Sequence, residues 1–192
     1  EVEVDAMAGR VLAWLQAPIA AARPSMGLVA KLASQVDGAP LARHLARLSA
    51  GMARRCGLLH VNAEGRPLPE ATLSVPVPIA LALHGHPSDW EGVETGFPAM
   101  PPLPQSQVEE AVRFARALGE GMPALALRGG QPIEARMAAR AIADALSLVP
   151  AFFEGDPAPG FGPWLWLTGH LPVLCLELAP GERRRLPRIP GY

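Results

Sequence analysis

The stretch ALALRGGQPIEARMAARAIADAL contains residues whose types and order are typical of a phosphate-binding loop. An apolar run at residues 124–127 predicts a buried strand, Gly129 and Gly130 predict a tight turn, and Pro132 suits the first turn of a helix. Backbone N–H groups at such a helix start face an anion, so this order of elements binds phosphate in many proteins.

The side chains that give a phosphate loop its chemistry are absent. A working loop needs a Lys that reaches the β- and γ-phosphate oxygens and a Ser or Thr that holds Mg²⁺. Counted from Gly129, these positions hold Ala135 and Arg136, and Glu134 stands where the second glycine belongs. We therefore predict no nucleotide hydrolysis. Residual nucleotide binding stays open for a set of five residues: Arg128, Gly129, Gly130, Arg136 and Glu177.

The stretch LPVLCLEL is similar to a Walker B strand, whose terminal carboxylates hold Mg²⁺. Only Glu177 is present, and Cys175 and Leu176 occupy the two places before it. A single acid at a strand end is more often solvated or salt-bridged. Glu177 is a candidate only because its strand is the second predicted strand after the Gly-Gly turn.

The cysteines raise a thiol hydrolase as a further alternative. Each has a histidine nearby in sequence, His60 for Cys56 and His170 for Cys175. A catalytic thiolate needs a base in contact and an electropositive, partly open setting. Both cysteines lie in apolar sequence, which favours inert thiols. The stretch HGHP lacks a Cys or acidic partner at metal-ligand spacing, so we predict no metal site.

Two further groups of residues suggest binding surfaces. Arginines gather on or near the helix expected before a hairpin, the position of a recognition helix: Arg43, Arg47, Arg54 and Arg55. That helix has no Asn, Gln or Lys to read bases, so a solvated polar face is favoured over DNA binding. The apolar turn predicted at GFGPWLWLTG supplies aromatic residues that either cap a sheet or contact another domain or subunit: Phe161, Trp164 and Trp166.

Periodicity predicts a helical first part, residues 1–86. Helical spacing of apolar residues marks VDAMAGRVLAWLQ, a short helix capped by Ser25, and APLARHLARLSAGMARRCG with a stop at Gly57. A hairpin around residues 63–65 and a brief IALAL helix follow. Two helices followed by a hairpin is the order of a winged helix.

An α/β second part is predicted at residues 106–192, after a Pro-rich linker or covering loop at 87–105. A capping box, Ser106 with Glu109, predicts a helix to about residue 118. Strands at residues 124–128, 149–153 and 172–178 and a helix at 132–147 then indicate a small parallel sheet covered on both faces.

The bulk composition excludes several classes of function. The chain has 192 residues, 49% hydrophobic content and a net charge of −1, so nothing in its overall charge attracts a polyanion or a membrane. Two cysteines form no disulfide framework, and no apolar run reaches the length of a membrane span or forms a signal peptide. We expect a cytoplasmic protein. Because the chain opens on Glu1 and stops at LPRIPGY, we also expect it to be part of a longer one.

Taken together, these stretches resemble the region N-terminal to the catalytic module in large bacterial AAA+ ATPases. The resemblance lies in an Arg-Pro-Thr-like motif, a GLL…PL…L-x-V segment, the loop and the closing stretch: Arg23, Pro24, Ser25, Leu28, Ala30, Gly57, Leu58, Leu59, Pro67, Leu68, Leu73, Val75, Leu127, Arg128, Gly129, residues 180–184, Leu186, Pro187, Gly191 and Tyr192.

This resemblance implies a winged-helix-like segment followed by a degenerate P-loop-like unit. Such a region is non-catalytic and acts in assembly or partner recruitment. Its partners would be other domains or subunits of the same ATPase, or an unidentified protein. ATP and Mg²⁺ would bind a catalytic module downstream of residue 192, so no catalytic residue is transferred to this chain.

Overall fold

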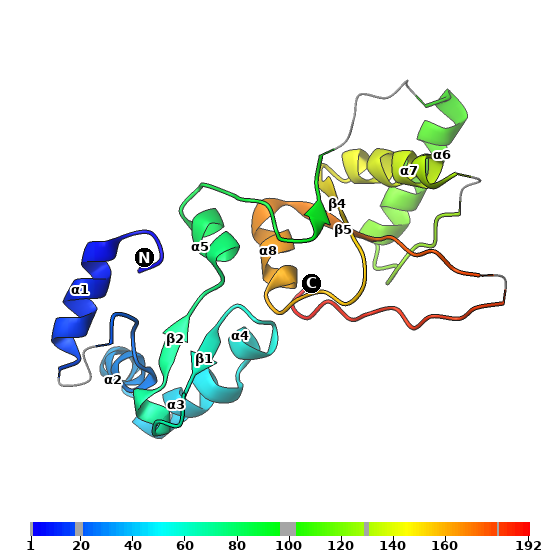
Figure 1. Cartoon of the computed structure of the whole chain (residues 1–192). Coiled ribbons are helices and arrows are strands. Elements are labelled where there is room, and N and C mark those ends of the chain that lie inside the picture. The colour runs from blue at the N-terminus through cyan, green and yellow to red at the C-terminus, as the bar shows by residue number, and fades with distance from the viewer. Residues whose placement is uncertain (1, 18–20, 97–102, 129–130, 180) are drawn as a thin grey trace. The chain divides into compact units, whose positions relative to one another are not determined.

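A computed structural model describes residues 2–17, 21–96, 103–128, 131–179 and 181–192. The chain divides into two compact units. Figure 1 colours the chain by residue number from the N-terminus to the C-terminus. The first consists of Glu1–Trp90, Pro157–Thr168 and Pro187–Tyr192; the second consists of Glu91–Asp156 and Gly169–Leu186. The sequence predicted parts that follow one another along the chain, at residues 1–86, 87–105 and 106–192. In the structure, by contrast, each unit combines segments that are separated in the sequence.

The first unit begins with helices whose ends follow ordinary capping chemistry. The helix α1 spans Ala6–Leu15, and α2 spans Met26–Asp37. The Ser25 side-chain oxygen accepts the Leu28 N–H at 3.3 Å, which confirms the predicted cap of α2. Gly38 ends α2 with a φ of +69°, a left-handed conformation that glycine adopts without steric cost.

The segment APLARHLARLSAGMARRCG, which was predicted as one helix ending at Gly57, forms two helices. The helix α3 spans Leu41–Ala50, and the short helix α4 spans Met52–Arg55. The break falls at Gly51, whose backbone is extended and whose N–H donates to the Arg47 carbonyl oxygen at 2.8 Å. A Cβ at this position would collide with that same oxygen, so the bend requires glycine.

The antiparallel pair predicted after these helices is confirmed, but its connection spans residues 63–71 instead of the tight turn predicted at 63–65. Strand β1 spans His60–Asn62 and pairs antiparallel with β2, Thr72–Ser74; the 3₁₀ helix η1, Leu68–Glu70, lies between them. The chain just before α2 adds a third extended partner to β2, because the Leu73 N–H donates to the Pro24 carbonyl oxygen at 2.9 Å. Side chains from the helices and the hairpin share one apolar core: Met26, Val29, Leu45, Leu48, Leu59, Val61, Ala71 and Leu73.

A buried glutamine joins α1 to this core. The Gln16 side chain is only 7% exposed, and both of its polar atoms are used. Its Nε2 donates to the carbonyl oxygens of Ala21 and Arg23 at 2.8 and 2.9 Å, and its Oε1 accepts the Ser25 N–H at 2.6 Å. Gln16 therefore fixes the end of α1 relative to the start of α2.

The segment predicted as an apolar turn is a helix, so that prediction is wrong. The helix α8 spans Phe161–Thr168, and α5, Val77–Leu83, packs against it. Pro163 lies in the first turn of α8, where the missing N–H costs no helical hydrogen bond. The Gly and Pro that suggested a turn instead mark the beginning of a helix.

An aromatic cluster holds α8 in the first unit. Trp164 contacts the rings of Trp90 and Phe161, each with a centroid separation of 5.8 Å. The Trp164 indole N–H also donates to the Ser88 carbonyl oxygen at 3.1 Å, so the buried indole keeps a hydrogen bond.

The second unit contains a small mixed sheet in the order β3-β4-β5. Strands β4, Val149–Phe153, and β5, His170–Leu174, are parallel, and β3, Val93–Glu94, pairs antiparallel with β4. The strand predicted at residues 149–153 is confirmed. The strand predicted at 172–178 begins earlier and ends at Leu174. The sequence predicted an all-parallel sheet, whereas the observed sheet has one antiparallel strand, β3, at its edge.

Two helices, α6 (Gln105–Gly119) and α7 (Pro132–Ala145), pack against each other in this unit. Residues 124–128 form no strand, so that prediction is wrong: Leu125 and Leu127 pack onto the core between α6 and α7 instead of joining the sheet. The capping box predicted at Ser106 is also absent, because α6 begins at Gln105 after Pro104 and no side chain caps it.

Candidate functional site

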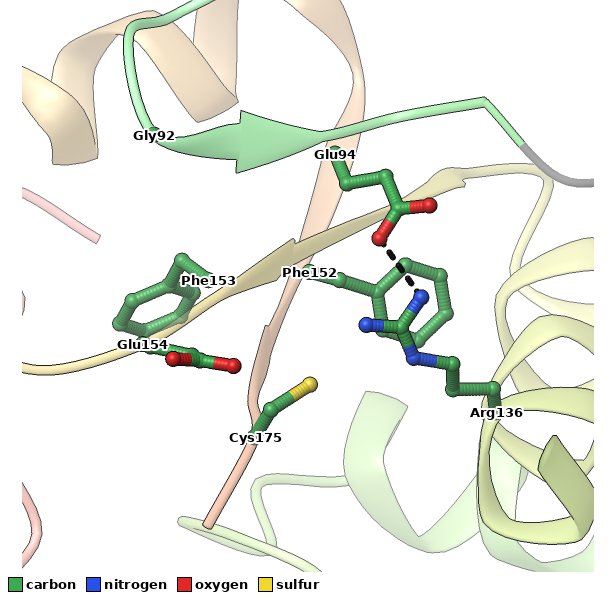
Figure 2. Close-up of a pocket in the computed structure, with 7 residues that line it drawn as sticks. All are labelled: Gly92, Glu94, Arg136, Phe152, Phe153, Glu154 and Cys175. Atoms are coloured by element: carbon green, nitrogen blue, oxygen red, sulfur yellow. Dashed lines mark hydrogen bonds and ion pairs between the residues drawn. The ribbon is translucent and has the colours of Figure 1, made fainter. Parts of the chain in front are cut away.

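A shallow cavity of about 160 Å³ lies at one edge of the sheet in the second unit. It is formed where β4 and β5 end, beside the first turns of α7. The carboxyl ends of parallel strands are the usual ligand-binding edge of α/β proteins. Figure 2 shows the residues that line it: Gly92, Glu94, Arg136, Phe152, Phe153, Glu154 and Cys175.

Arg136 is the central charged residue of this cavity. Its Nη1 donates to the Glu94 carboxylate at 2.6 Å, and its guanidinium carbon lies 4.9 Å from the centroid of the Phe152 ring (Figure 2). The hydrogen bond to Glu94 raises the pKa of Arg136 above its ordinary value, and the neighbouring Cys175 side chain adds to this effect. Arg136 is therefore held in one place by a carboxylate and an aromatic ring.

The charges around the cavity do not suit a polyphosphate. The carboxylates of Glu94 and Glu154 line it together with the single guanidinium of Arg136, so a nucleotide would meet a net negative wall. Glu134, which stands at the second glycine position of a phosphate loop, instead caps its own helix: its carboxylate accepts the Gln131 N–H at 3.3 Å.

The predicted nucleotide-binding residues do not converge in the described part of the chain. Arg136 lines the cavity, whereas Arg128 and Glu177 are exposed, in irregular segments. Gly129 and Gly130 lie outside the described residues. Sequence reasoning missed Glu94 and Glu154, because Glu94 meets Arg136 only through the pairing of β3 with β4.

The described residues place neither cysteine beside the histidine that is its neighbour in sequence. Cys175 follows the last residue of β5, whereas His170 is the first, so the strand holds them at opposite ends. Cys56 is buried, and its thiol lies 3.5 Å from the Ala53 carbonyl oxygen, while His60 is exposed. Among the described residues, no histidine lines the cavity at Cys175.

The three aromatic residues predicted at an interface separate into two groups. Phe161 and Trp164 are each 1% exposed and belong to the core of the first unit. Trp166 is 70% exposed, and its ring lies 5.9 Å from that of Tyr192. Only Trp166 is available to a partner. The partial burial of Tyr192 raises the pKa of its phenol.

The predicted basic surface is exposed on α3 and α4. All four of its members are solvent-accessible: Arg43, Arg47, Arg54 and Arg55. His44 on α3 is buried, and its Nε2 lies 3.0 Å from the Asp37 carboxylate. The pKa of Asp37 is lowered mainly by the backbone N–H of Ala39, with a further contribution from His44.

The apolar face of α1 is exposed to solvent. The amphipathic sequence identified this face but did not predict its exposure. Met7, Val11 and Leu15 recur at helical spacing and are 57%, 52% and 57% exposed, and Trp14 beside them is 78% exposed. An amphipathic helix usually buries such a face against its own core. We call these four residues the α1 stripe. Contiguous exposed apolar surface of this kind is typical of interaction sites.

Comparison with known proteins finds no match, whether among family models, curated proteins or solved structures. In the part of the chain that the structure describes, the helices are too short or too polar to cross a membrane.

Proposed function

We propose that this chain is a non-catalytic interaction region of an AAA+ ATPase, and that it acts in assembly by pairing the α1 stripe with that of a second copy. The exposure of the stripe is the observation that carries this proposal. Its four side chains are each more than half exposed, and Trp14 is the most exposed of the chain's four tryptophans.

The arrangement of the stripe favours another helix as its occupant. Met7, Val11, Trp14 and Leu15 follow the three- and four-residue spacing with which helices pack side by side. None of the four is charged, but the Arg10 guanidinium lies beside the stripe, with its Nη1 3.8 Å from the Met7 sulfur, so a pairing of two stripes must leave this cation exposed at the edge of the contact. A symmetric dimer interface uses the same patch twice, and the stripe is self-complementary in this sense.

The order of elements in the first unit supports the winged-helix part of the proposal. The helix α1, the extended residues before α2, then α2, α3, α4 and the hairpin follow one another as they do in a winged helix. For the second unit, the ion pair of Arg136 with Glu94 supports a role in packing rather than in phosphate chemistry. On this proposal, ATP and Mg²⁺ belong to a catalytic module elsewhere in the ATPase.

Sedimentation velocity over a protein concentration series tests the proposal. We expect the wild-type chain to self-associate as its concentration rises. Trp14→Glu and Val11→Glu should abolish this association, because each would bury a charge in an apolar contact.

Val36→Glu is the matched control. Val36 is 89% exposed on α2, outside the stripe, so this variant should associate as the wild type does. A wild-type chain that stays monomeric at millimolar concentration, or a loss of association in Val36→Glu equal to that in Trp14→Glu, would contradict the proposal.

A further inference from the structure

We infer that the α3–α4 segment of the first unit binds duplex DNA without sequence preference. The inference rests on the charge of residues 38–63, which include four arginines and no Asp or Glu. The net charge of the whole chain, −1, conceals this local excess of positive charge. DNA attracts such a surface through its regularly spaced phosphates.

The guanidinium groups of this segment are available to a ligand. In the described residues, no ion pair forms at Arg43, Arg47, Arg54 or Arg55, and all four side chains are exposed. The carboxylates that flank the segment have partners of their own. Asp37 accepts from His44 and from the Ala39 N–H, and Glu64 accepts from the Asn62 amide at 2.9 Å. The Arg43 charge also contributes to the lowered pKa of Asp37, but the two side chains form no ion pair.

The shape of α3 suits a groove. Its exposed face carries Arg43 and Arg47 one turn apart, and the neighbouring exposed positions Ala42, Ala46 and Ala50 have minimal side chains. These alanines allow the helix backbone to approach a surface closely. An α-helix is about 10–12 Å wide, and the major groove of B-DNA is about 12 Å wide. The opposite face of α3 is anchored, since Leu45 and Leu48 pack into the core.

The composition of the face favours duplex DNA over a single strand. Arginine binds phosphate and carboxylate groups alike through two N–H groups at once, so competition with poly-glutamate is needed to distinguish duplex DNA from an acidic peptide. The segment contains no Phe, Tyr or Trp on which unpaired bases could stack, so a single strand is a weaker ligand. It contains no exposed Asn or Gln in its helices to read adenine, and we assign all four arginines to phosphates rather than to guanine edges, so we expect no sequence preference.

Fluorescence anisotropy with a labelled duplex of mixed sequence tests the inference over a salt series. Four arginine–phosphate contacts give a slope of log K against log salt of about −3.6, since each contact contributes about 0.9. Between 50 and 200 mM salt, the affinity should then fall by about 150-fold. The double variant Arg43→Ala/Arg47→Ala should halve the slope to about −1.8.

The controls separate a local site from general attraction. Arg43→Lys/Arg47→Lys keeps the charge and should retain most of the salt slope. The triple variant Arg183→Ala/Arg184→Ala/Arg185→Ala removes three exposed arginines of the second unit and should bind as the wild type does. Tryptophan fluorescence checks that the variants in the first unit are folded, and far-UV circular dichroism checks the triple variant, because all four tryptophans belong to the first unit. Alanine at exposed helical positions favours the helix, so we expect Arg43→Ala/Arg47→Ala to fold.

Four outcomes would overturn the inference. They are no binding at 25 mM salt, an unchanged slope in Arg43→Ala/Arg47→Ala, a loss of binding in the triple variant, and displacement of the duplex by poly-glutamate as readily as by unlabelled duplex. The last result would identify an acidic peptide as the partner. Trp14→Glu should bind the duplex normally, because the α1 stripe is a separate surface; this keeps the test independent of self-association.

Discussion

The close packing around Gly57 in the first unit leads to a prediction about the stability of an alanine variant. This residue has a φ of +77°, and a Cβ added to it would collide with the backbone at Pro159 and Gly160 and lie 2.7 Å from the Cβ of Pro159. The Gly160 N–H also donates to the Cys56 carbonyl oxygen at 3.0 Å. Gly57→Ala should therefore push the 157–168 segment away from the helices that precede the hairpin.

A matched control separates packing from backbone strain. Gly65 in the hairpin loop has the same φ of +77°, and a Cβ there would meet nothing within 4 Å. Both alanine variants carry the cost of a left-handed residue, about 1–2 kcal/mol. Only Gly57→Ala adds overpacking, about 1–3 kcal/mol, and a weakened hydrogen bond, about 1 kcal/mol. We expect Gly57→Ala to be less stable than Gly65→Ala by about 2–4 kcal/mol.

Urea denaturation followed by tryptophan fluorescence measures this difference. All four tryptophans, at positions 14, 90, 164 and 166, belong to the first unit, so the signal reports that unit alone. With a urea dependence of about 1–3 kcal/mol per molar, the unfolding midpoint of Gly57→Ala should lie about 1–2 M below that of Gly65→Ala. Equal midpoints for the two variants would refute the packing of residues 157–168 against Gly57.

Three other predictions each concern the contacts of one side chain. Gln16→Ala removes three hydrogen bonds of a buried side chain and should lower the free energy of unfolding by about 2–4 kcal/mol in the same assay, whereas Gln35→Ala, at an exposed position of α2 in the same unit, should change it by less than about 0.5 kcal/mol. Because the folded pKa of Asp37 is lowered, its carboxylate stabilises the fold above the unfolded pKa, and this contribution fades as the pH falls through the lower folded value. Asp37→Asn should therefore reduce the urea midpoint at pH 7, and the difference from wild type should shrink as the pH falls below the unfolded pKa. Glu94→Gln breaks a half-exposed ion pair and should destabilise the second unit by at most about 1 kcal/mol, read by far-UV circular dichroism.

Local signals in the sequence predicted the elements whose ends are set by nearby residues. The predicted cap at Ser25 marks the start of α2, and it acts within three residues of itself. The strand β4 was predicted because its apolar run is short and bounded, and it is almost wholly buried.

The missed elements depend on distant parts of the chain. Residues 124–128 are apolar enough for a strand, but Leu125 and Leu127 find their contacts on helices, and an apolar run alone does not distinguish these outcomes. The helix α8 is apolar on nearly every side, so it lacks the periodic pattern that identifies a surface helix.

The candidate cavity was predicted only in part for the same reason. Arg136 was identified from its position in the helix after the Gly-Gly turn. Its partner Glu94 lies 42 residues earlier, in a proline-rich segment without periodicity, and reaches it only because β3 pairs with β4. The exposure of the α1 stripe was likewise hidden, because an amphipathic pattern states which face is apolar and not what covers it.

Hydrogen exchange as a function of protein concentration tests the central claim, self-association through α1, most directly. We predict that the amides of Ala6–Leu15 become more protected as the concentration rises from micromolar to millimolar, while those of Gln105–Gly119 do not change. Protection of α1 that is independent of concentration, or that rises equally in α6, would contradict the claim.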